Sequence, residues 1–136
     1  MKFLLDTHIL LWSFFDTKKL PENIKNILLD EHNEIYYSPV NLWEISIKYG
    51  LGKLRLNGFT PEELLQEIEN GFFICKNIEP NIMATTYKLP LIHTDPFDRF
   101  LIWEAINSKF KLISVDEKVK KYESFGLSVV KYERLS

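Results

Sequence analysis

Short apolar runs alternate with longer amphipathic stretches along this chain, a pattern that predicts strands alternating with helices. Apolar runs of strand length occupy residues 3–5, 34–38, 72–75, 111–115 and 127–132. Helices are predicted over residues 8–15, 22–30, 40–49, 61–69, 80–88, 97–109 and 117–123, the last of them short and polar. This alternation favours an α/β fold, with a mostly parallel sheet and helices on both of its faces.

Capping and turn residues set the ends of several predicted helices. Ser38-Pro39 supplies the N-cap and the first helical residue of the helix over 40–49, and Gly50 is expected to end that helix. Thr60-Pro61-Glu62-Glu63 is a capping box for the following helix, and Asp95-Pro96 begins the helix over 97–109. On the helix over 40–49, one stripe is predicted to face the core: Leu42, Ile45, Ser46 and Tyr49.

The composition is that of a globular protein with one domain. The chain has 136 residues, 46% apolar and 26% charged, which suits a single domain over residues 1–132 and a short, loose tail at 133–136. Cys75 is the one cysteine, so no intrachain disulfide forms and a reducing compartment is expected. No apolar stretch approaches membrane-spanning length, and the N-terminal apolar run is too short for a signal peptide, which favours a cytoplasmic protein without a membrane partner.

The overall charge gives no sign of nucleic-acid binding. The formal net charge is -2, so a polyanion would need a local basic surface or metal ions that offset the acids. Lys48, Lys53 and Arg55 are candidates for a basic rim, although solvated surface charge is the favoured interpretation of these residues.

Two acids follow apolar strands in the same way. Asp6 comes directly after the run at residues 3–5, and Asp116 ends the run at residues 111–115. In a parallel sheet both strand ends lie at the same edge, so neighbouring strands would bring both carboxylates to one crevice. The alternative is that each acid only caps the helix that follows it.

Two further acids lie on predicted helices. Asp98 shares a stripe with apolar residues three, four and seven positions later, where an unpaired acid is unfavourable. The alternative for Asp98 is a local one: at the third helical position it would bond the N-cap residue and interact favourably with the helix dipole. We interpret Asp95 as that N-cap rather than as a metal ligand. Glu44 lies four residues before Lys48, and its alternative is a surface ion pair.

Together these acids fit a site for a hard divalent cation. Mg²⁺ prefers carboxylate oxygens, and crowded acids repel one another when no cation is present. The sequence has no Cys/His cluster at zinc spacing, no glycine-rich phosphate loop and no nucleophile elbow. Oxygen-only metal chemistry therefore remains as the catalytic option, and its commonest use is phosphodiester or phosphoryl transfer.

Five segments resemble the PIN domain and, more narrowly, the VapC-type ribonuclease toxins of bacterial toxin–antitoxin pairs. They are Leu4-Leu5-Asp6-Thr7-His8, Leu42-Trp43-Glu44-Ile45-Ser46-Ile47-Lys48, Gly52-Lys53-Leu54, His93-Thr94-Asp95-Pro96-Phe97-Asp98-Arg99 and Ser114-Val115-Asp116. The resemblance runs from Met1 to about Tyr132. It implies a five-stranded sheet in the order 3-2-1-4-5, RNA cleavage that depends on Mg²⁺ or Mn²⁺, a homodimer and inhibition by a cognate antitoxin.

The acidic positions of the family map onto Asp6, Glu44, Asp98 and Asp116. The resemblance implies that these four residues are catalytic and bind the metal, with Glu44 acting directly or through a water.

Residues beside these acids are candidates for contacts with substrate or with the acids themselves. Thr7 and Ser114 would orient an acid or bind a phosphate, and His93 would touch the substrate. Arg99 would pair with an active-site carboxylate or bind an RNA phosphate, with an ordinary surface ion pair as its alternative. The three tryptophans are predicted to be core, with base stacking as their alternative: Trp12, Trp43 and Trp103.

Three rival classes use similar residues. A haloacid-dehalogenase-type phosphatase needs a second aspartate two residues after the first, where this chain has His8. A receiver-type signalling domain needs an acidic neighbour for Asp6, which is also absent. A non-catalytic interaction module needs no converging acids and stays open. Core is the default for Phe14-Phe15, with an antitoxin groove or a dimer surface as the alternative for this pair.

Overall fold

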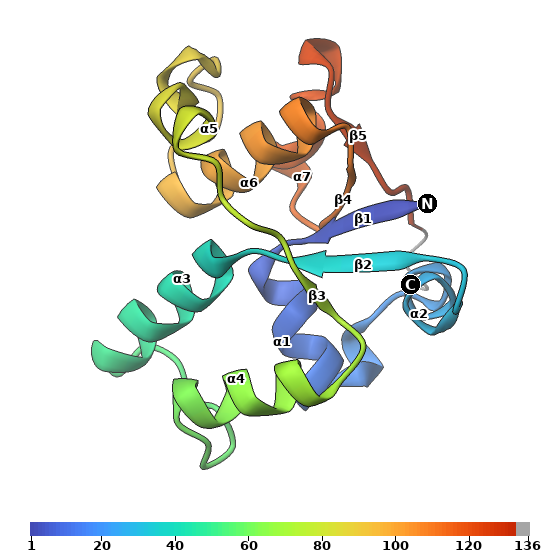
Figure 1. The fold of residues 1–136 in the computed structure, drawn as a ribbon, viewed down its shortest axis with the longest axis vertical. Coiled ribbons are helices and arrows are strands. Elements are labelled where there is room, and N and C mark those ends of the chain that lie inside the picture. Colours follow the sequence, from blue (N-terminus) through green and yellow to red (C-terminus); the bar gives the residue numbers. More distant parts are fainter. Residues whose placement is uncertain (133–136) are drawn as a thin grey trace.

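The computed structural model describes residues 1–132, and the predicted tail at 133–136 lies outside them. Five strands form one sheet in the order β3-β2-β1-β4-β5 (Figure 1). All four strand pairings are parallel, which confirms the predicted sheet and its order. The strands are β1 (Lys2–Leu5), β2 (Glu34–Tyr37), β3 (Ile74–Cys75), β4 (Lys111–Ile113) and β5 (Ser128–Val129).

Helices connect the strands throughout the described residues. The α-helices are α1 (Thr7–Phe15), α2 (Glu22–Leu29), α3 (Pro39–Gly50), α4 (Pro61–Asn70), α5 (Pro80–Ala84), α6 (Pro96–Ser108) and α7 (Glu117–Lys120). Short 3₁₀ helices lie at η1 (Thr17–Lys19), η2 (Thr86–Lys88) and η3 (Glu123–Phe125). No helix among residues 1–132 is long and apolar enough to span a membrane.

Several element boundaries differ from the predicted ones. The helix predicted over 80–88 ends at Ala84, because the hydroxyls of Thr85 and Thr86 bond carbonyls of the preceding turn, and the chain continues as η2. The α3 helix ends at Gly50, as predicted, with Gly50 as its last helical residue. The turn is made two residues later at Gly52, whose φ of 72° is favourable for glycine.

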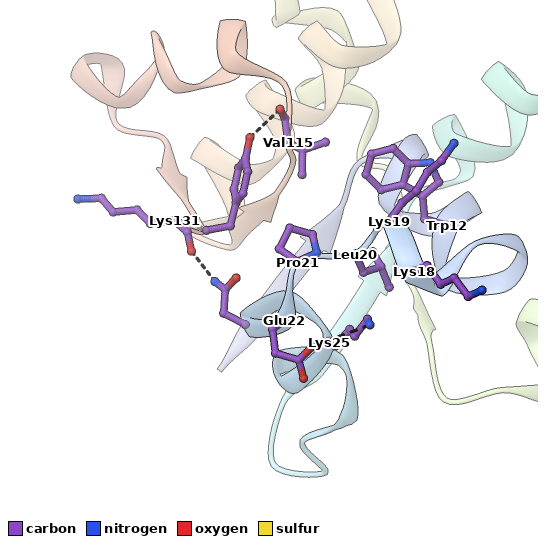
Figure 2. Close-up of a pocket in the computed structure, with 11 residues that line it drawn as sticks. Trp12, Lys18, Lys19, Leu20, Pro21, Glu22, Lys25, Val115 and Lys131 are labelled. Atoms are coloured by element: carbon purple, nitrogen blue, oxygen red, sulfur yellow. Dashed lines mark hydrogen bonds and ion pairs between the residues drawn. The ribbon is translucent and has the colours of Figure 1, made fainter. Parts of the chain in front are cut away.

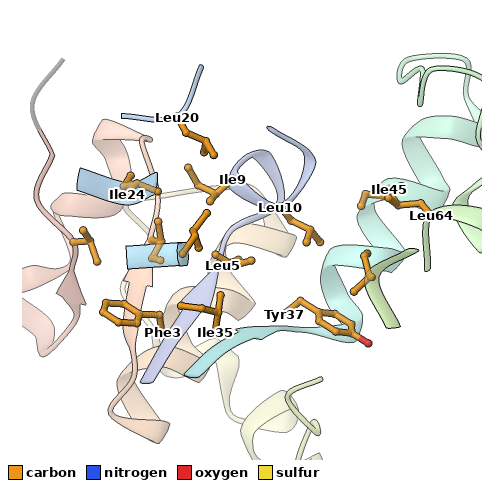
Figure 3. Close-up of a cluster of buried hydrophobic side chains, with 14 of the residues drawn as sticks. Phe3, Leu5, Ile9, Leu10, Leu20, Ile24, Ile35, Tyr37, Ile45 and Leu64 are labelled. Carbon is orange, nitrogen blue, oxygen red and sulfur yellow. The ribbon is translucent and has the colours of Figure 1, made fainter. Parts of the chain in front are cut away.

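Helices cover both faces of the sheet, as predicted. Side chains on β1 alternate between the faces, with Phe3 and Leu5 in one core cluster and Leu4 in the other. Figure 3 shows the first cluster, where Ile9 of α1, Ile24 of α2 and further residues of α3 and α4 meet the sheet. The second cluster joins Leu4 and β4 to residues of α6 and α7.

The pairing of β1 with β4 places the first acid beside the last. Leu5 is in register with Ile113, and the amide of Asp6 donates to the carbonyl of Ile113 at 3.1 Å. Residues just after β1 and β4 therefore lie at one edge of the sheet. After β1 the chain continues on one face of the sheet, and after β4 it continues on the other face. Ligands bind at such a point in open parallel sheets.

Candidate active site

Asp6 and Asp116 occupy matching positions at this edge. A carboxylate oxygen of Asp6 accepts a hydrogen bond from the amide of Ile9 at 2.9 Å and caps α1. Asp116 accepts one from the amide of Lys118 at 2.9 Å and caps α7. Both acids are therefore caps and also converge on one edge. The two interpretations are compatible because each cap uses one of the two carboxylate oxygens.

Asp98 reaches the same edge from α6. Asp95 caps this helix by accepting hydrogen bonds from the amides of Phe97 and Asp98, as predicted. The Asp98 carboxylate lies 3.1 Å from Nε2 of His93, and the Asp116 carboxylate lies 3.0 Å from the same nitrogen. Ligand atoms of these three residues, His93, Asp98 and Asp116, all lie within 4.8 Å of one another.

Hydrogen bonds fix the tautomer of His93. The amide of Asp95 donates to Nδ1 of His93 at 3.1 Å, so Nδ1 acts as the acceptor in this contact. Nε2 therefore carries the proton and donates it towards both Asp98 and Asp116. His93 is only 6% exposed, and in this tautomer it joins two acids as a donor, leaving the carboxylate oxygens as the ligands for a cation.

Glu44 is held at the site by a donor on each oxygen. Oε1 accepts a hydrogen bond from the Thr7 hydroxyl at 2.5 Å, and Oε2 lies 2.5 Å from Nζ of Lys48. The Glu44–Lys48 pair that the sequence allowed is present, but Glu44 is 3% exposed, so the pair is not a surface one.

The buried side of α3 matches the predicted stripe only in part. Ile45 is buried and Leu42 packs against the core, whereas Ser46 and Tyr49 are exposed. Two polar residues, Asn41 and Glu44, are buried on α3 beside the apolar Val40 and Ile45.

The pKa of Asp98 shows how closely the acids are grouped. Burial raises it most, and the charges of Asp95, Asp6, Glu44 and Asp116 raise it further, to about 8. Burial likewise raises the pKa of Asp6, against hydrogen bonds from Ser114 and Ile9 that lower it. The Asp116 carboxyl is the exception: burial raises its pKa, but hydrogen bonds from Lys118 and His93 outweigh burial and leave it lowered.

This group of acids fits a divalent cation. Its donors are carboxylate oxygens, the ligands that Mg²⁺ and Mn²⁺ prefer. The raised pKa of Asp98 reflects repulsion among acids that a bound cation would relieve. Lys48 offsets part of this charge, and its hydrogen bond to Glu44, together with Asp95 and Asp98, raises the pKa of the Lys48 ammonium group.

Small polar residues set the positions of the acids. Ser114 bonds Asp6 through its side chain and accepts a hydrogen bond from the amide of Asp116 at 3.1 Å, so one hydroxyl joins both strand ends. Thr7 bonds Glu44, as described above. Asn41, which the sequence analysis missed, donates to the Thr7 hydroxyl at 3.1 Å and to the carbonyl of Leu5. Its signal was the position three residues after the Ser38 cap, where it completes a capping box.

Arg99 has a different role from the ones predicted. Its guanidinium donates to four backbone carbonyls of the preceding loop, those of Thr86, Leu89, Pro90 and His93. It therefore holds the loop that carries His93, and makes neither a carboxylate pair nor a surface ion pair in the described structure. The Tyr122 hydroxyl assists by accepting from the amides of Ile92 and His93 and donating to the Pro90 carbonyl.

The prediction that Trp43 belongs to the core is wrong. Its side chain is 58% exposed, and its ring contacts Phe97 edge-on, with centroids 5.2 Å apart. Trp12 and Trp103 are partly buried and pack against the two core clusters. Lys53 and Arg55, the other residues of the predicted basic rim, are exposed.

The chain is similar in fold to several solved structures. One is VapBC2 from Rickettsia felis bound to a promoter DNA fragment, with 17% identity, a TM-score of 0.70 and coverage of 98% of this chain and 100% of that one. VapBC-1 from nontypeable Haemophilus influenzae has 17% identity, a TM-score of 0.65 and coverage of 96% and 97%. DNA-bound VapBC from Salmonella typhimurium has 19% identity, a TM-score of 0.61 and coverage of 96% and 97%. At these identities the likeness is one of fold.

Sequence comparison gives a relative and a family. An uncharacterized protein of Dictyostelium discoideum is 34% identical over 80 residues, which are 59% of this chain and 10% of that protein. The matched region thus spans about a tenth of the length of this curated relative. The family model of the PIN domain matches residues 3–124, a range that includes all four acids of the site. The chain belongs to the PIN domain family.

Proposed function

We propose that this protein is a metal-dependent ribonuclease that acts as the toxin of a toxin–antitoxin pair. One observation carries the proposal: Asp6, Glu44, Asp98 and Asp116 are grouped at the edge where β1 and β4 meet. PIN domains are nucleases, and such a group of acids suits the hydrolysis of phosphodiester bonds. The solved neighbours named VapBC are toxin–antitoxin complexes, which supports a small cognate antitoxin as a partner.

Each acid has a distinct task in this proposal. Asp6, Asp98 and Asp116 would hold one or two divalent cations, with Glu44 binding directly or through a water. When bound, Mg²⁺ or Mn²⁺ would supply the positive charge that activates a water and stabilises the leaving oxygen. The products would be a 5′-phosphate and a 3′-hydroxyl.

The remaining residues of the site orient these acids. Thr7 and Lys48 hold the two oxygens of Glu44, so this side chain has one rotamer before substrate arrives. The His93 Nε2–H keeps Asp98 and Asp116 together, and the Ser114 hydroxyl joins Asp6 to the backbone of Asp116. A phosphodiester would then meet carboxylates whose positions are already set.

The metal requirement is tested by incubating the purified protein with total cellular RNA in Mg²⁺, in Mn²⁺ and in excess EDTA. We expect cleavage in Mg²⁺ or Mn²⁺ and none in EDTA, because the carboxylates alone do not activate water. The cleaved ends should accept a ligase adaptor that requires a 5′-phosphate. Cleavage that persists in EDTA would contradict the metal requirement. No cleavage in any lane would favour a non-catalytic interaction module.

We also propose that the protein is a homodimer. Large apolar side chains are exposed on α3 and on the α5–η2 segment, both of which contact α6: Trp43, Ile47, Met83 and Tyr87. Exposed apolar residues of this kind suit an interface between copies. Replacing Ile47 and Tyr87 together with aspartate should convert the dimer to a monomer in light scattering. Leu29→Asp, at an exposed position on α2, is the control. A wild-type protein that is monomeric at micromolar concentration would contradict the proposal.

A further inference from the structure

A basic and aromatic pocket of about 920 Å³ lies between α1, the start of α2 and the segments that follow β4 and β5. Figure 2 shows it with its lining residues. The lining residues are Trp12, Lys18, Lys19, Leu20, Pro21, Glu22, Asn23, Lys25, Val115, Lys131 and Tyr132.

The charge of the pocket is opposite to that of the chain. Four lysines and one glutamate line it, whereas the whole chain carries a net charge of -2. Lys19 lies 3.5 Å from Asp16, and Lys25 lies 3.9 Å from Glu22. Lys18 has no ion-pair partner within residues 1–132, so its charge is available to an anion there. The pocket thus provides the local basic surface that a polyanion requires.

An aromatic ring lies in the same wall. Trp12 is partly buried, packs against the core and lines the pocket, with Nζ of Lys19 5.9 Å from its ring centroid. The exposed ring of His8 lies one turn earlier on α1, and its centroid is 6.0 Å from the centroid of the Trp12 ring. Lysines beside an aromatic ring are the combination with which proteins bind single-stranded nucleic acid, because bases stack on the ring while cations bind the phosphates.

Two segments of the chain lead from the acid site to the pocket. Val115 lines the pocket and lies between Ser114 and Asp116, and the Tyr132 hydroxyl donates to its carbonyl at 2.9 Å. On the other wall, α1 begins at Thr7 and reaches Trp12 less than two turns later. A strand whose phosphate lies at the acids therefore has a path along α1 towards the lysines.

We propose that this pocket binds the single-stranded RNA substrate next to the bond that is cleaved, with a base on Trp12, one phosphate on Lys18 and a second phosphate on Lys19. This inference rests on the proposed ribonuclease function and names the substrate subsite of the same site. It requires single-stranded RNA, because the bases of a duplex are already stacked and paired and are not free to lie on Trp12.

Binding is measured in EDTA, so that no cleavage is needed, by the fluorescence anisotropy of a labelled single-stranded RNA 12-mer. Trp12→Leu should weaken binding about tenfold, through the lost stacking. The Lys18→Gln/Lys19→Gln pair should lower the slope of log affinity against log salt by about 1.4, since two phosphate contacts are lost. A duplex of the same sequence should bind more weakly than the single strand.

The control is Lys2→Gln/Lys109→Gln, which removes the same charge at the opposite edge of the sheet and should leave the salt slope unchanged. Thermal melting confirms that each variant is folded. Unchanged RNA affinity and salt slope in both pocket variants would overturn the inference even if RNA is cleaved in Mg²⁺, and a protein partner would then be the remaining occupant. Pocket-dependent binding without any cleavage in Mg²⁺ would instead overturn the nuclease proposal alone.

Discussion

Asp6→Asn should abolish RNA cleavage, by at least about a thousandfold, while the protein stays folded. A neutral amide is a poor ligand for Mg²⁺, and the loss of one negative charge weakens cation binding by the whole group. Asparagine keeps the oxygen that accepts from the amide of Ile9, so the cap of α1 is preserved. Initial rates on the same RNA, for variant and wild type in Mg²⁺, measure the effect.

The stability of this variant separates a lost ligand from a lost fold. Burial raises the pKa of Asp6, so its charged form is unfavourable in the metal-free protein. The melting temperature of Asp6→Asn in EDTA should therefore equal or exceed that of the wild type. Asp30→Asn, at an exposed position of the C-cap of α2, is the control and should cleave normally. Full activity in a folded Asp6→Asn protein would remove Asp6 from the site.

The metal-free protein should lose stability as the pH rises from about 4 to 8. The unfolded chain releases the Asp98 proton near pH 4, whereas the folded protein retains it up to about pH 8. Between these values the folded state binds one more proton at Asp98, so this group lowers the free energy of unfolding by up to about 1.4 kcal/mol per pH unit. Glu104 adds to this slope, because burial raises its pKa to about 7. Asp116, with its lowered pKa, acts oppositely, and the stability that it contributes is lost only as the solution becomes acidic.

Urea denaturation in EDTA at pH 5, 6, 7 and 8 measures this slope. Asp98→Asn should flatten the dependence of the free energy of unfolding on pH and raise the stability at pH 8. Glu104→Gln, on the same helix, should remove only the smaller part of this dependence, the part that lies below pH 7. Mg²⁺ should stabilise the wild type more at pH 8 than at pH 5, because it binds the ionised carboxylates. A wild-type stability that does not change over this range would mean that Asp98 is not held among the other acids.

The sequence was sufficient for the parts of the site that depend on local rules. Asp6 and Asp116 follow buried strands, and the parallel arrangement of those strands determines that they meet. Asp98 was identifiable because an acid on an apolar stripe needs a partner. These inferences need only the positions of the elements, which the hydrophobic pattern gives.

The other features of the site depend on contacts between residues that are far apart in the sequence. The Tyr122 hydroxyl bonds residues about thirty positions away. Asn41 bonds the end of β1, and the capping box at Ser38 indicates its local contact but not this distant one. On α3 the apolar pattern predicted only part of the buried stripe, because the polar residues Asn41 and Glu44 are buried together with Ile45. Trp43 is exposed because α3 directs the neighbouring residue, Glu44, towards the site, and this leaves Trp43 on the outer side of the helix.

The four carbonyls bound by Arg99 have a consequence for the entropy of ligand binding. Arg99 follows Asp98 on α6, and the loop that it holds carries His93, so helix and loop are joined into one rigid body. The Nε2–H group of His93, which donates to the Asp98 carboxylate, is therefore in place before a cation or an RNA arrives. Binding then requires little ordering of the loop, and more of the interaction free energy is retained as affinity.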